Sequence, residues 1–169
     1  MGLKVAPLRI LGIDPGSRAT GYGVIEKRGA TLSFVACGVI RATPKGALPE
    51  RLREIHDGVC EVIATHQPDK AAVENLFVSV NAMSALKLGH ARGVILLALV
   101  QQGLEVHEYS PRLIKQTVAG YGQAAKAQVQ QMVRSLLSLS ATPSQDAADA
   151  LAVALCFASH WRPEGGSPP

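Results

Sequence analysis

The sequence has few cysteines, few charged residues and no long uninterrupted run of apolar residues. Its three cysteines, Cys37, Cys60 and Cys156, are an odd number without CxxC spacing, which argues against a disulfide framework and against a zinc site. Apolar runs such as residues 93–100 fall short of the roughly 18 residues that a membrane helix needs, and no basic and then apolar leader opens the chain. We therefore expect a cytoplasmic protein that is not bound to a membrane.

The chain does contain enough apolar material for one full core. Its 169 residues are 47% hydrophobic and only 18% charged, which is typical of a globular protein and excludes bulk disorder. No internal repeat and no second domain boundary is visible, so residues 1–161 are predicted to form a single domain. Residues 162–169 contain three prolines and two glycines and are predicted to be a disordered tail.

Positive charge is concentrated in the central third of the chain. Residues 84–142 carry six Lys and Arg against two Asp and Glu, whereas residues 143–169 carry one against three. A basic surface beside isolated acids suits an enzyme that holds a polyanion and acts on it; the alternative is an ordinary solvated basic face.

Hydrophobic periodicity predicts three consecutive strands, which indicates an antiparallel meander, and then an alternation of helices and strands. A last helix is predicted to run to about Trp161, with Thr142 as N-cap, Pro143 at N1 and Gln145 at N3 of a capping box. The fold class is therefore α/β, with helices flanking a mixed sheet. The other predicted elements are strands at 8–14, 20–27, 31–41, 71–74 and 104–109, and helices at 82–101, at 125–139 and from Leu48 and Pro111.

Four acidic residues stand in apolar surroundings, where a carboxylate needs a compensating partner. Asp14 and Glu74 each end a predicted apolar strand, and Asp146 and Asp149 interrupt an Ala-rich helix. Residues three apart share a helix face, and strand ends deliver side chains to the sheet edge where α/β proteins place their sites. We therefore expect one acidic cluster. The alternatives are a turn-forming role for Asp14, a helix-dipole role for Asp146 and pairing of Glu74 with a nearby Lys.

Carboxylates gathered in one place repel one another unless cations neutralise them. Hard oxygen ligands without His or Cys favour magnesium or manganese over zinc. Two such ions about 3.5–4 Å apart can activate a water molecule and steady the leaving oxygen in phosphodiester cleavage. The cluster thus predicts metal-dependent hydrolysis of phosphodiesters.

Three motifs carry a specific family resemblance: GIDPGS at 12–17, VENLF at 73–77 and QDAADA at 145–150. In their order and spacing the sequence resembles the RuvC family of Holliday junction resolvases, and the resemblance covers nearly all of residues 8–157. It implies an RNase H-like fold, with a mixed five-stranded sheet of three antiparallel and then two parallel strands. It also implies paired symmetric nicks in four-way junction DNA during recombination and repair, with RuvA and RuvB as partners.

The resemblance assigns roles to individual residues. It implies that Asp14, Glu74, Asp146 and Asp149 are the catalytic metal ligands, binding two Mg²⁺ ions that Mn²⁺ can replace. The family's aromatic residue beside the active site, which engages bases at the junction centre, corresponds to Phe77. The basic residues that the family needs for DNA handling and cleavage correspond to Lys115 and Lys126. Lys87 and Arg92, which lie in the matching segment 84–93, and Arg134 are further candidate DNA-binding residues.

Local sequence supports two of these assignments. Lys126, Gln130 and Arg134 recur every four residues and form a basic stripe able to follow a phosphate backbone, unless they are a plain solvated face. Phe77 follows a candidate catalytic acid and could stack on unpaired bases, or it could be a core residue.

A homodimer is expected, because two symmetric nicks require two matching active sites. The expected interface is the helix over 82–101, which has more apolar residues than one amphipathic face needs: Met83, Leu86, Val94, Leu97 and Val100.

Two rival functions belong to other classes. Asp14 to Ser17, followed by Gly21 and Gly23, resembles the phosphate loop of the actin-like ATP-binding phosphotransfer domains, although 169 residues leave room for only one of the two domains needed. A non-catalytic junction-binding module would use the basic surface but would leave the carboxylates without a role.

Overall fold

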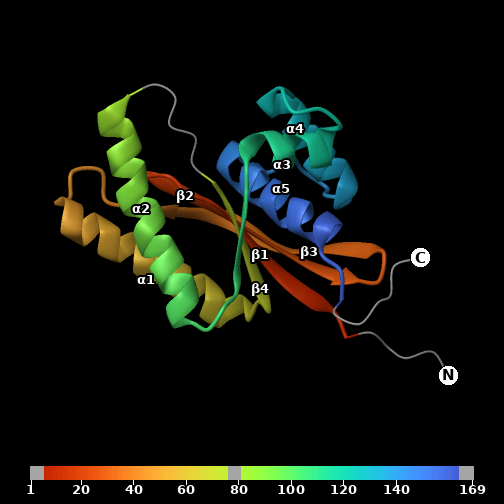
Figure 1. The fold of residues 1–169 in the computed structure, drawn as a ribbon, viewed down its shortest axis with the longest axis horizontal. Coiled ribbons are helices and arrows are strands. Elements are labelled where there is room, and N and C mark those ends of the chain that lie inside the picture. Colours follow the sequence, from red (N-terminus) through yellow and green to blue (C-terminus); the bar gives the residue numbers. More distant parts are fainter. Residues whose placement is uncertain (1–5, 76–80, 164–169) are drawn as a thin grey trace.

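A computed structural model describes residues 6–75 and 81–163, and its core is one five-stranded sheet with helices on both faces (Figure 1). The strands lie in the order β3-β2-β1-β4-β5. This order confirms the predicted mixed sheet. The strands are β1 Leu8–Asp14, β2 Ala19–Arg28, β3 Thr31–Arg41, β4 Lys70–Glu74 and β5 Val106–Tyr109, and the helices are α1 Leu48–His66, α2 Ala82–Gln101, α3 Pro111–Ala119, α4 Lys126–Leu136 and α5 Gln145–His160.

The central strand β1 joins the antiparallel half of the sheet to the parallel half. It pairs antiparallel with β2, and β2 pairs antiparallel with β3. On its other side β1 runs parallel to β4, with Ile13 opposite Val73, and β4 runs parallel to β5. The next residues, Asp14 and Glu74, therefore end neighbouring parallel strands at the same edge of the sheet.

Alternation along the strands divides the core into two layers. In β1, Ile10 contributes to the layer under α3, α4 and α5, whereas Leu11 and Ile13 contribute to the layer under α1 and α2. Figure 1 shows the same division, with α1 and α2 on one side of the sheet and the other three helices on the opposite side. Both sides of a strand such as β1 are thus buried, which explains its nearly continuous apolar sequence.

Helix α5 is buried almost along its whole length and lies very close to β1 and β2. Glycines make this approach possible: a Cβ on Gly12 would lie 2.2 Å from the Ala150 carbonyl oxygen, and one on Gly21 would lie 2.0 Å from that of Asp146. The alanines of α5 serve the same purpose from the helix side. Close packing of small residues therefore fixes where α5 holds its acids.

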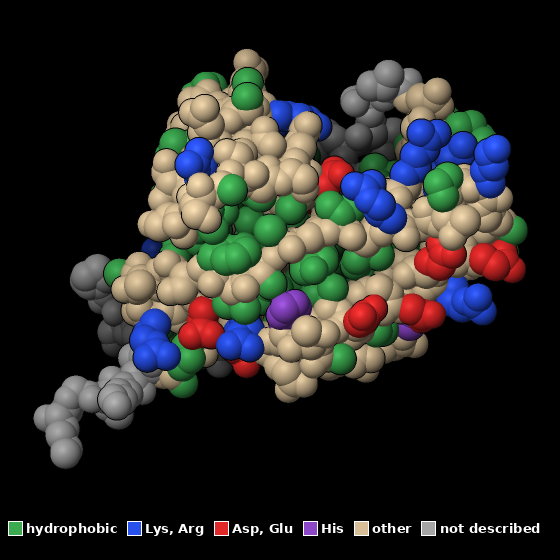
Figure 2. All heavy atoms as spheres, turned by 180° about the vertical axis from the view of Figure 1, so that it is seen from behind, with side chains coloured by type: hydrophobic (Ala, Val, Ile, Leu, Met, Phe, Trp, Pro, Cys, Tyr) green, Lys and Arg blue, Asp and Glu red, His purple; other side chains and the backbone are tan. Residues whose placement is uncertain are grey.

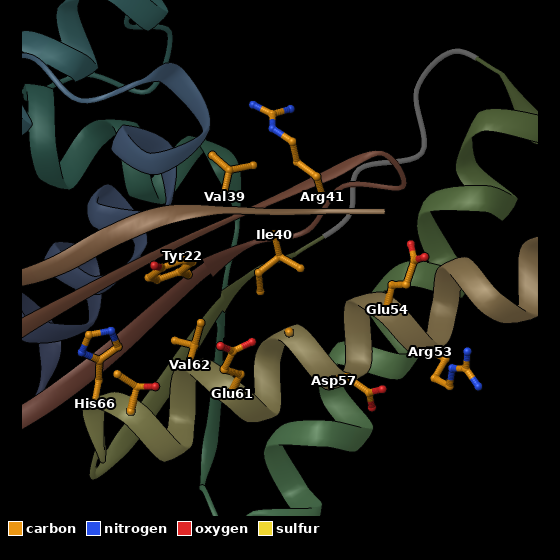
Figure 3. A pocket seen from close by; sticks show the side chains of 12 residues that line it. Tyr22, Val39, Ile40, Arg41, Arg53, Glu54, Asp57, Glu61, Val62 and His66 are labelled. Carbon is orange, nitrogen blue, oxygen red and sulfur yellow. The ribbon is translucent and has the colours of Figure 1, made fainter. Parts of the chain in front are cut away.

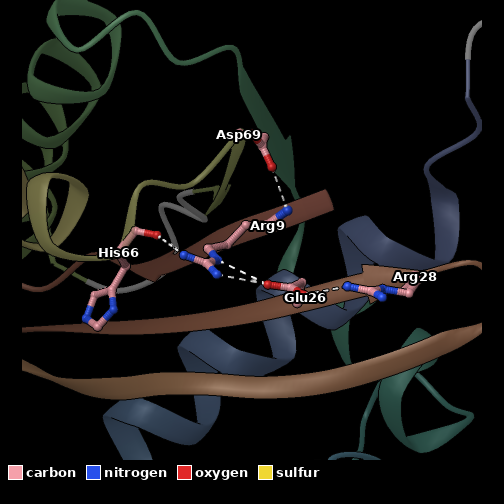
Figure 4. A network of polar contacts seen from close by, with 5 residues as sticks. All are labelled: Arg9, Glu26, Arg28, His66 and Asp69. Carbon is pink, nitrogen blue, oxygen red and sulfur yellow. Dashed lines mark hydrogen bonds and ion pairs between the residues drawn. The ribbon is translucent and has the colours of Figure 1, made fainter. Parts of the chain in front are cut away.

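At the opposite end of β1, an arginine ties three segments together (Figure 4). The Arg9 guanidinium donates to the Glu26 carboxylate on β2, at 2.9 Å, and to the carbonyl oxygen of His66 at the end of α1, at 2.7 Å. The Arg9 backbone N–H donates to the Asp69 carboxylate at 2.8 Å. These bonds anchor the end of the sheet that lies away from Asp14.

Three predicted boundaries differ from the structure by two or three residues, and each difference has a local cause. The N-cap of α5 is Ser144 and not Thr142, because the Ser144 hydroxyl accepts from the Ala147 N–H, while the Pro143 carbonyl accepts from a side chain of α4. Strand β5 begins at Val106, because the Leu104 N–H donates to the carbonyl oxygen at the end of α2. Helix α4 ends at Leu136 before a residue of positive φ, Ser138.

Helix α2 is the one helix of the described residues that is long and apolar enough to cross a membrane, judged by length and composition. Lys87 and Arg92 lie within this helix, so its apolar residues do not form one uninterrupted run. The face of α2 that packs against α1 and the sheet is buried through Ala91, Ile95, Ala98 and Leu99.

Replacing Gly12 by Ala should lower the free energy of unfolding by about 2–3 kcal/mol, because the new methyl group would force α5 away from β1. Urea unfolding measures this change. The matched control is Gly89→Ala in α2, where a Cβ meets nothing within 4 Å. This control should be neutral or should stabilise by about 0.5–1 kcal/mol. Equal effects of the two substitutions would contradict the packing argument.

Candidate active site

The four predicted acids come from three elements that meet at one edge of the sheet. Asp14 is the last residue of β1 and Glu74 the last of β4, and these strands are parallel neighbours. Asp146 and Asp149 lie in the first two turns of α5, which packs over β1 and β2.

A pocket of about 180 Å³ brings three of these acids together with two lysines. Its charged lining consists of Asp14, Glu74, Asp149, Lys115 and Lys126, and its apolar wall comes from α3, α4 and α5. Asp146 does not line the pocket, although its charge acts on both Asp14 and Asp149.

Burial and mutual repulsion disfavour the charged forms of these carboxyl groups. Desolvation, a hydrogen bond with Glu74 and the charges of Glu74 and Asp146 raise the pKa of Asp14 far above its ordinary value. Desolvation, and then the charge of Asp14, raise the pKa of Asp149 to about 6. Lys126 opposes both shifts. The positive charge around these carboxyl groups is therefore too small to offset their burial and mutual repulsion.

The donor set fits a hard divalent cation in its chemistry, since all of the acidic groups offer oxygen atoms. A cation would also relieve the repulsion that raises the pKa of Asp14. In the described part of the chain, no three His, Cys, Asp or Glu side chains form a ready-made metal-binding group. The carboxyl groups thus share a pocket without being preset as a coordination shell.

The predicted basic residues fall into two groups. Lys115 and Lys126 line the acidic pocket, and both lower the pKa of Asp149. Arg134 lies farther along α4, and its guanidinium donates to the carbonyl oxygens of Leu139 and Ser140, each at 3.3 Å. The middle of the predicted stripe, Gln130, donates to the Pro143 carbonyl oxygen. Two members of the stripe therefore hold the loop that leads into α5.

The remaining predicted DNA contacts lie apart from this pocket or outside the described residues. Lys87 is exposed on α2. Arg92 is only 14% exposed in its side chain and is paired with Glu108 of β5. Phe77 lies outside the described residues, so its role stays a prediction.

Sequence reasoning missed the residues that hold the loop after Asp14. The Thr20 hydroxyl is fully buried, donates to the Gly16 carbonyl oxygen and accepts from the Gly16 N–H. From α1, the Arg51 guanidinium donates to the Ser17 carbonyl oxygen at 2.7 Å. Arg51 is 34 residues from Ser17 in sequence, so spacing could not reveal this contact.

A larger open hollow of about 780 Å³ lies between α1 and β3 (Figure 3). Its lining includes Tyr22, Ile40, Asp57 and Glu61, and none of the predicted site residues. The volume of a cavity therefore does not identify the candidate site. The candidate site is identified by the acidic residues that converge in the smaller pocket.

The sheet order, with acids at the ends of β1 and β4 and on a helix packed over them, defines a nuclease of the RNase H-like class. A family model described as "Crossover junction endodeoxyribonuclease RuvC" matches residues 10–157. The chain belongs to the RuvC family. Membership in this nuclease family implies a requirement for a divalent metal ion.

Similar proteins agree with this assignment. The RuvC of Cupriavidus metallidurans is 56% identical over 152 residues, which cover 90% of this chain and 84% of the relative. That of Photorhabdus laumondii is 58% identical over 146 residues, covering 86% and 84%. The structure of Thermus thermophilus RuvC in complex with a Holliday junction substrate is 38% identical, with a TM-score of 0.83, covering 89% of this chain and 93% of that one.

The yeast mitochondrial Holliday junction resolvase shares the fold, with a TM-score of 0.65 at 12% identity, covering 89% of this chain and 79% of that one. The actin-like interpretation was wrong, since the chain belongs to a nuclease family. Gly21 and Gly23, which suggested a phosphate loop, instead lie directly beneath α5.

Replacing Asp14 by Asn should stabilise the protein in metal-free buffer. Folding raises the pKa of both Asp14 and Asp149, the latter to about 6. Such a group stabilises the fold while it is protonated, and this stabilisation is lost as the pH rises through its pKa in the folded protein. In chelator, the free energy of unfolding of the unsubstituted protein should therefore fall between about pH 5 and pH 8. At about pH 8 the variant should be more stable by about 1–3 kcal/mol.

Urea unfolding across this pH range measures the effect, with Glu61→Gln on the exposed face of α1 as the control of unchanged stability. An Asp14→Asn protein that is less stable than the original at the upper end of the range would contradict the assigned electrostatics.

Proposed function

We propose that the protein is a structure-selective endodeoxyribonuclease that resolves Holliday junctions by paired symmetric nicks, in homologous recombination and DNA repair. The observation that carries the proposal is the pocket in which Asp14, Glu74 and Asp149 face Lys115 and Lys126. Acids from two strands and a helix converge there in a chain of the RuvC family. As a RuvC-family nuclease, it acts on DNA inside the cell, in the cytoplasm.

The proposed reaction is hydrolysis that depends on Mg²⁺, with two ions per site, and Mn²⁺ as a substitute. Asp14, Glu74, Asp146 and Asp149 would hold the ions, which when bound polarise the phosphodiester and activate the attacking water. Lys126 and Lys115 stabilise the added phosphate charge, and by lowering the pKa of Asp149 they help to keep this carboxylate available as a ligand.

Junction DNA is proposed as the substrate because a similar RuvC has been solved with a Holliday junction substrate. Figure 2 shows a concentration of Lys and Arg at the upper right of one face, on the side of α1 and α2, and most Asp and Glu there lie lower. Such a surface can hold a phosphate backbone. Phe77, Lys87, Arg92 and Arg134 are proposed DNA contacts on sequence grounds.

A homodimer is proposed because two nicks of matching geometry need two active sites related by two-fold symmetry. Its interface would lie along α2, where Met83, Leu86, Leu97 and Val100 are exposed. Val94, also expected there, is half-buried against the core. RuvA and RuvB are proposed as the partners that move the junction.

An end-labelled synthetic four-way junction, and a linear duplex of the same sequence, should separate the candidate functions. With Mg²⁺ we expect paired nicks on opposite strands of the junction only, and with chelator no cleavage. Asp149→Asn should lower the nicking rate more than about 100-fold, while junction binding in a gel-shift assay stays within about threefold of the original.

The control variant is Glu61→Gln, which lies outside the pocket and should cleave normally. Junction binding without cleavage in either Mg²⁺ or Mn²⁺ would instead identify a non-catalytic binding module. Equal cleavage of the duplex would remove the structural selectivity.

Lys126 and Arg134 both lie on α4, but their replacement should affect different properties, the cleavage rate for Lys126 and the stability for Arg134. Under single-turnover conditions with saturating protein, Lys126→Ala should slow cleavage of bound junction about 10- to 100-fold, because it removes positive charge from the pocket. Arg134→Ala should change this rate less than about threefold while lowering the free energy of unfolding by about 1 kcal/mol, because it frees two loop carbonyls. Equal rate losses would contradict the distinction.

A further inference from the structure

Strand β3 is an edge strand of the sheet. It stands first in the strand order, so only β2 pairs with it in the described part of the chain. Its backbone N–H and C=O groups therefore divide into one set that bonds to β2 and another set that faces outward. Outward groups of this kind are a template on which another extended chain can pair.

The register of β2 and β3 identifies the outward groups. The Ala42 N–H donates to the Arg18 carbonyl oxygen at 3.2 Å, and this pair continues the register of the two strands. Hydrogen-bonded pairs alternate with non-bonded pairs along an antiparallel ladder. The backbone groups of Cys37, Val39 and Arg41 consequently face outward. No backbone hydrogen bond joins them to another described segment.

The open hollow of about 780 Å³ between α1 and β3 lies beside this edge, and Val39, Ile40 and Arg41 line it from β3. Figure 3 shows Ile40 pointing toward α1, whereas Val39 and Arg41 point to the opposite side of the strand. The hollow is apolar where β3 meets α1, because a Cβ on Gly58 would lie 2.5 Å from the Ile40 side chain. A strand added to β3 would therefore lie over this hollow.

Helix α1 gives the hollow an acidic wall, which consists of Asp57 and Glu61, one turn apart and both exposed. Glu61 forms no ion pair within the described residues, and Asp57 pairs only with its sequence neighbour His56, at 3.1 Å. A third acid of the lining, Glu54, is already bound, because its carboxylate accepts from the backbone N–H and the hydroxyl of Thr43. The acidic wall thus has negative charge available for a ligand.

Two arginines also line the hollow, but they do not neutralise the acidic wall. Arg41 points away from α1 (Figure 3). Hydrogen bonds from Thr43, and then the charge of Arg53, lower the pKa of Glu54, so Arg53 acts at the Glu54 end of the hollow. The part of the hollow beside Glu61 therefore favours a cationic group.

Charge and hydrogen bonding together select the occupant. The acidic wall repels a phosphate backbone, so DNA does not fit. A second copy of β3 does not fit either, because the positions that face α1 beside the hollow, Gly38 and Ile40, carry no cation. An extended peptide with Lys or Arg at alternate positions fits both features, since its backbone can pair with β3 while its cations reach the acidic wall.

We propose that the outer edge of β3 and the acidic wall of α1 bind an extended, cation-rich segment of another protein as an added antiparallel strand. Residues of this segment opposite Val39 and Arg41 exchange backbone hydrogen bonds with β3, and those opposite Gly38 and Ile40 direct Lys or Arg side chains toward α1. The hollow shares no lining residue with the acidic pocket, so a bound partner leaves that pocket free. This inference does not rest on the proposed function.

The probe is a fluorescein-labelled peptide of about eight residues in which Lys and Val alternate, long enough to span the outward groups of β3. Fluorescence anisotropy with the full chain measures its binding. Glu61→Lys should weaken binding about fivefold or more, because it reverses a charge of the acidic wall. The matched control is Glu50→Lys, which reverses one charge on α1 outside the hollow and should change the dissociation constant less than about twofold.

Two methylated versions of the probe test the strand pairing. In the proposed geometry the Lys side chains face α1, so the Val residues direct their N–H groups at β3 and the Lys residues direct theirs away. N-methylation of the internal Val residues should weaken binding about tenfold or more, and N-methylation of the Lys residues less than about threefold. The reverse order would overturn the antiparallel direction, and equal effects would overturn the pairing itself.

Other occupants give other results. A peptide in which Glu and Val alternate should bind at least about tenfold more weakly than the Lys–Val probe, and tighter binding would identify an anionic partner instead. A fall in the sedimentation coefficient of the protein on addition of the Lys–Val probe would identify a second copy as the occupant. Absence of saturable binding would overturn the proposal outright. Circular dichroism and thermal unfolding establish that both charge variants are folded.

Discussion

Repulsion among carboxyl groups at one edge of the sheet is the constraint on which the rest of the structure depends. Asp14 and Glu74 end adjacent parallel strands, and α5 adds Asp149 in the same pocket. Burial and repulsion raise the pKa of both aspartates, so holding these groups together costs free energy in the absence of a cation. Lys115 and Lys126 offset only part of this cost. A protein keeps such an arrangement for a task that needs several oxygen ligands in one place.

Small residues decide where the third carrier of acids lies. Gly12 and Gly21 allow the backbone of α5 to approach the sheet, with the Asp146 carbonyl directly over β2. Larger residues there would lift α5 and move its aspartates away from Asp14. The geometry of the acidic pocket therefore depends on the absence of side chains in the strands as much as on the presence of carboxylates. The close approach of α5 also explains why β2 contains the glycines that resembled a phosphate loop.

The two faces of the sheet carry different surfaces. The face covered by α3, α4 and α5 supplies the two lysines of the pocket and the buried wall behind them. The face covered by α1 and α2 carries the exposed apolar side chains of α2. Arg51 connects the two, because it lies on α1 and holds the loop that follows Asp14 through the Ser17 carbonyl. Changes in how α1 and α2 pack can thus reach the loop beside the acidic pocket.

The sequence by itself determined the strand and helix order, the carriers of the four acids and the family, because these follow from local periodicity and from motifs a few residues long. Tertiary structure decided which charged groups meet. The spacing of Lys126, Gln130 and Arg134 predicted one basic stripe, but only Lys126 lines the pocket, while the other two bind loop carbonyls. The N-cap of α5 is Ser144 and not Thr142, and the carbonyl of the intervening Pro143 accepts from Gln130 of α4. Spacing along a helix gives the direction in which a side chain points, but the packing of the neighbouring loop decides which partner lies there.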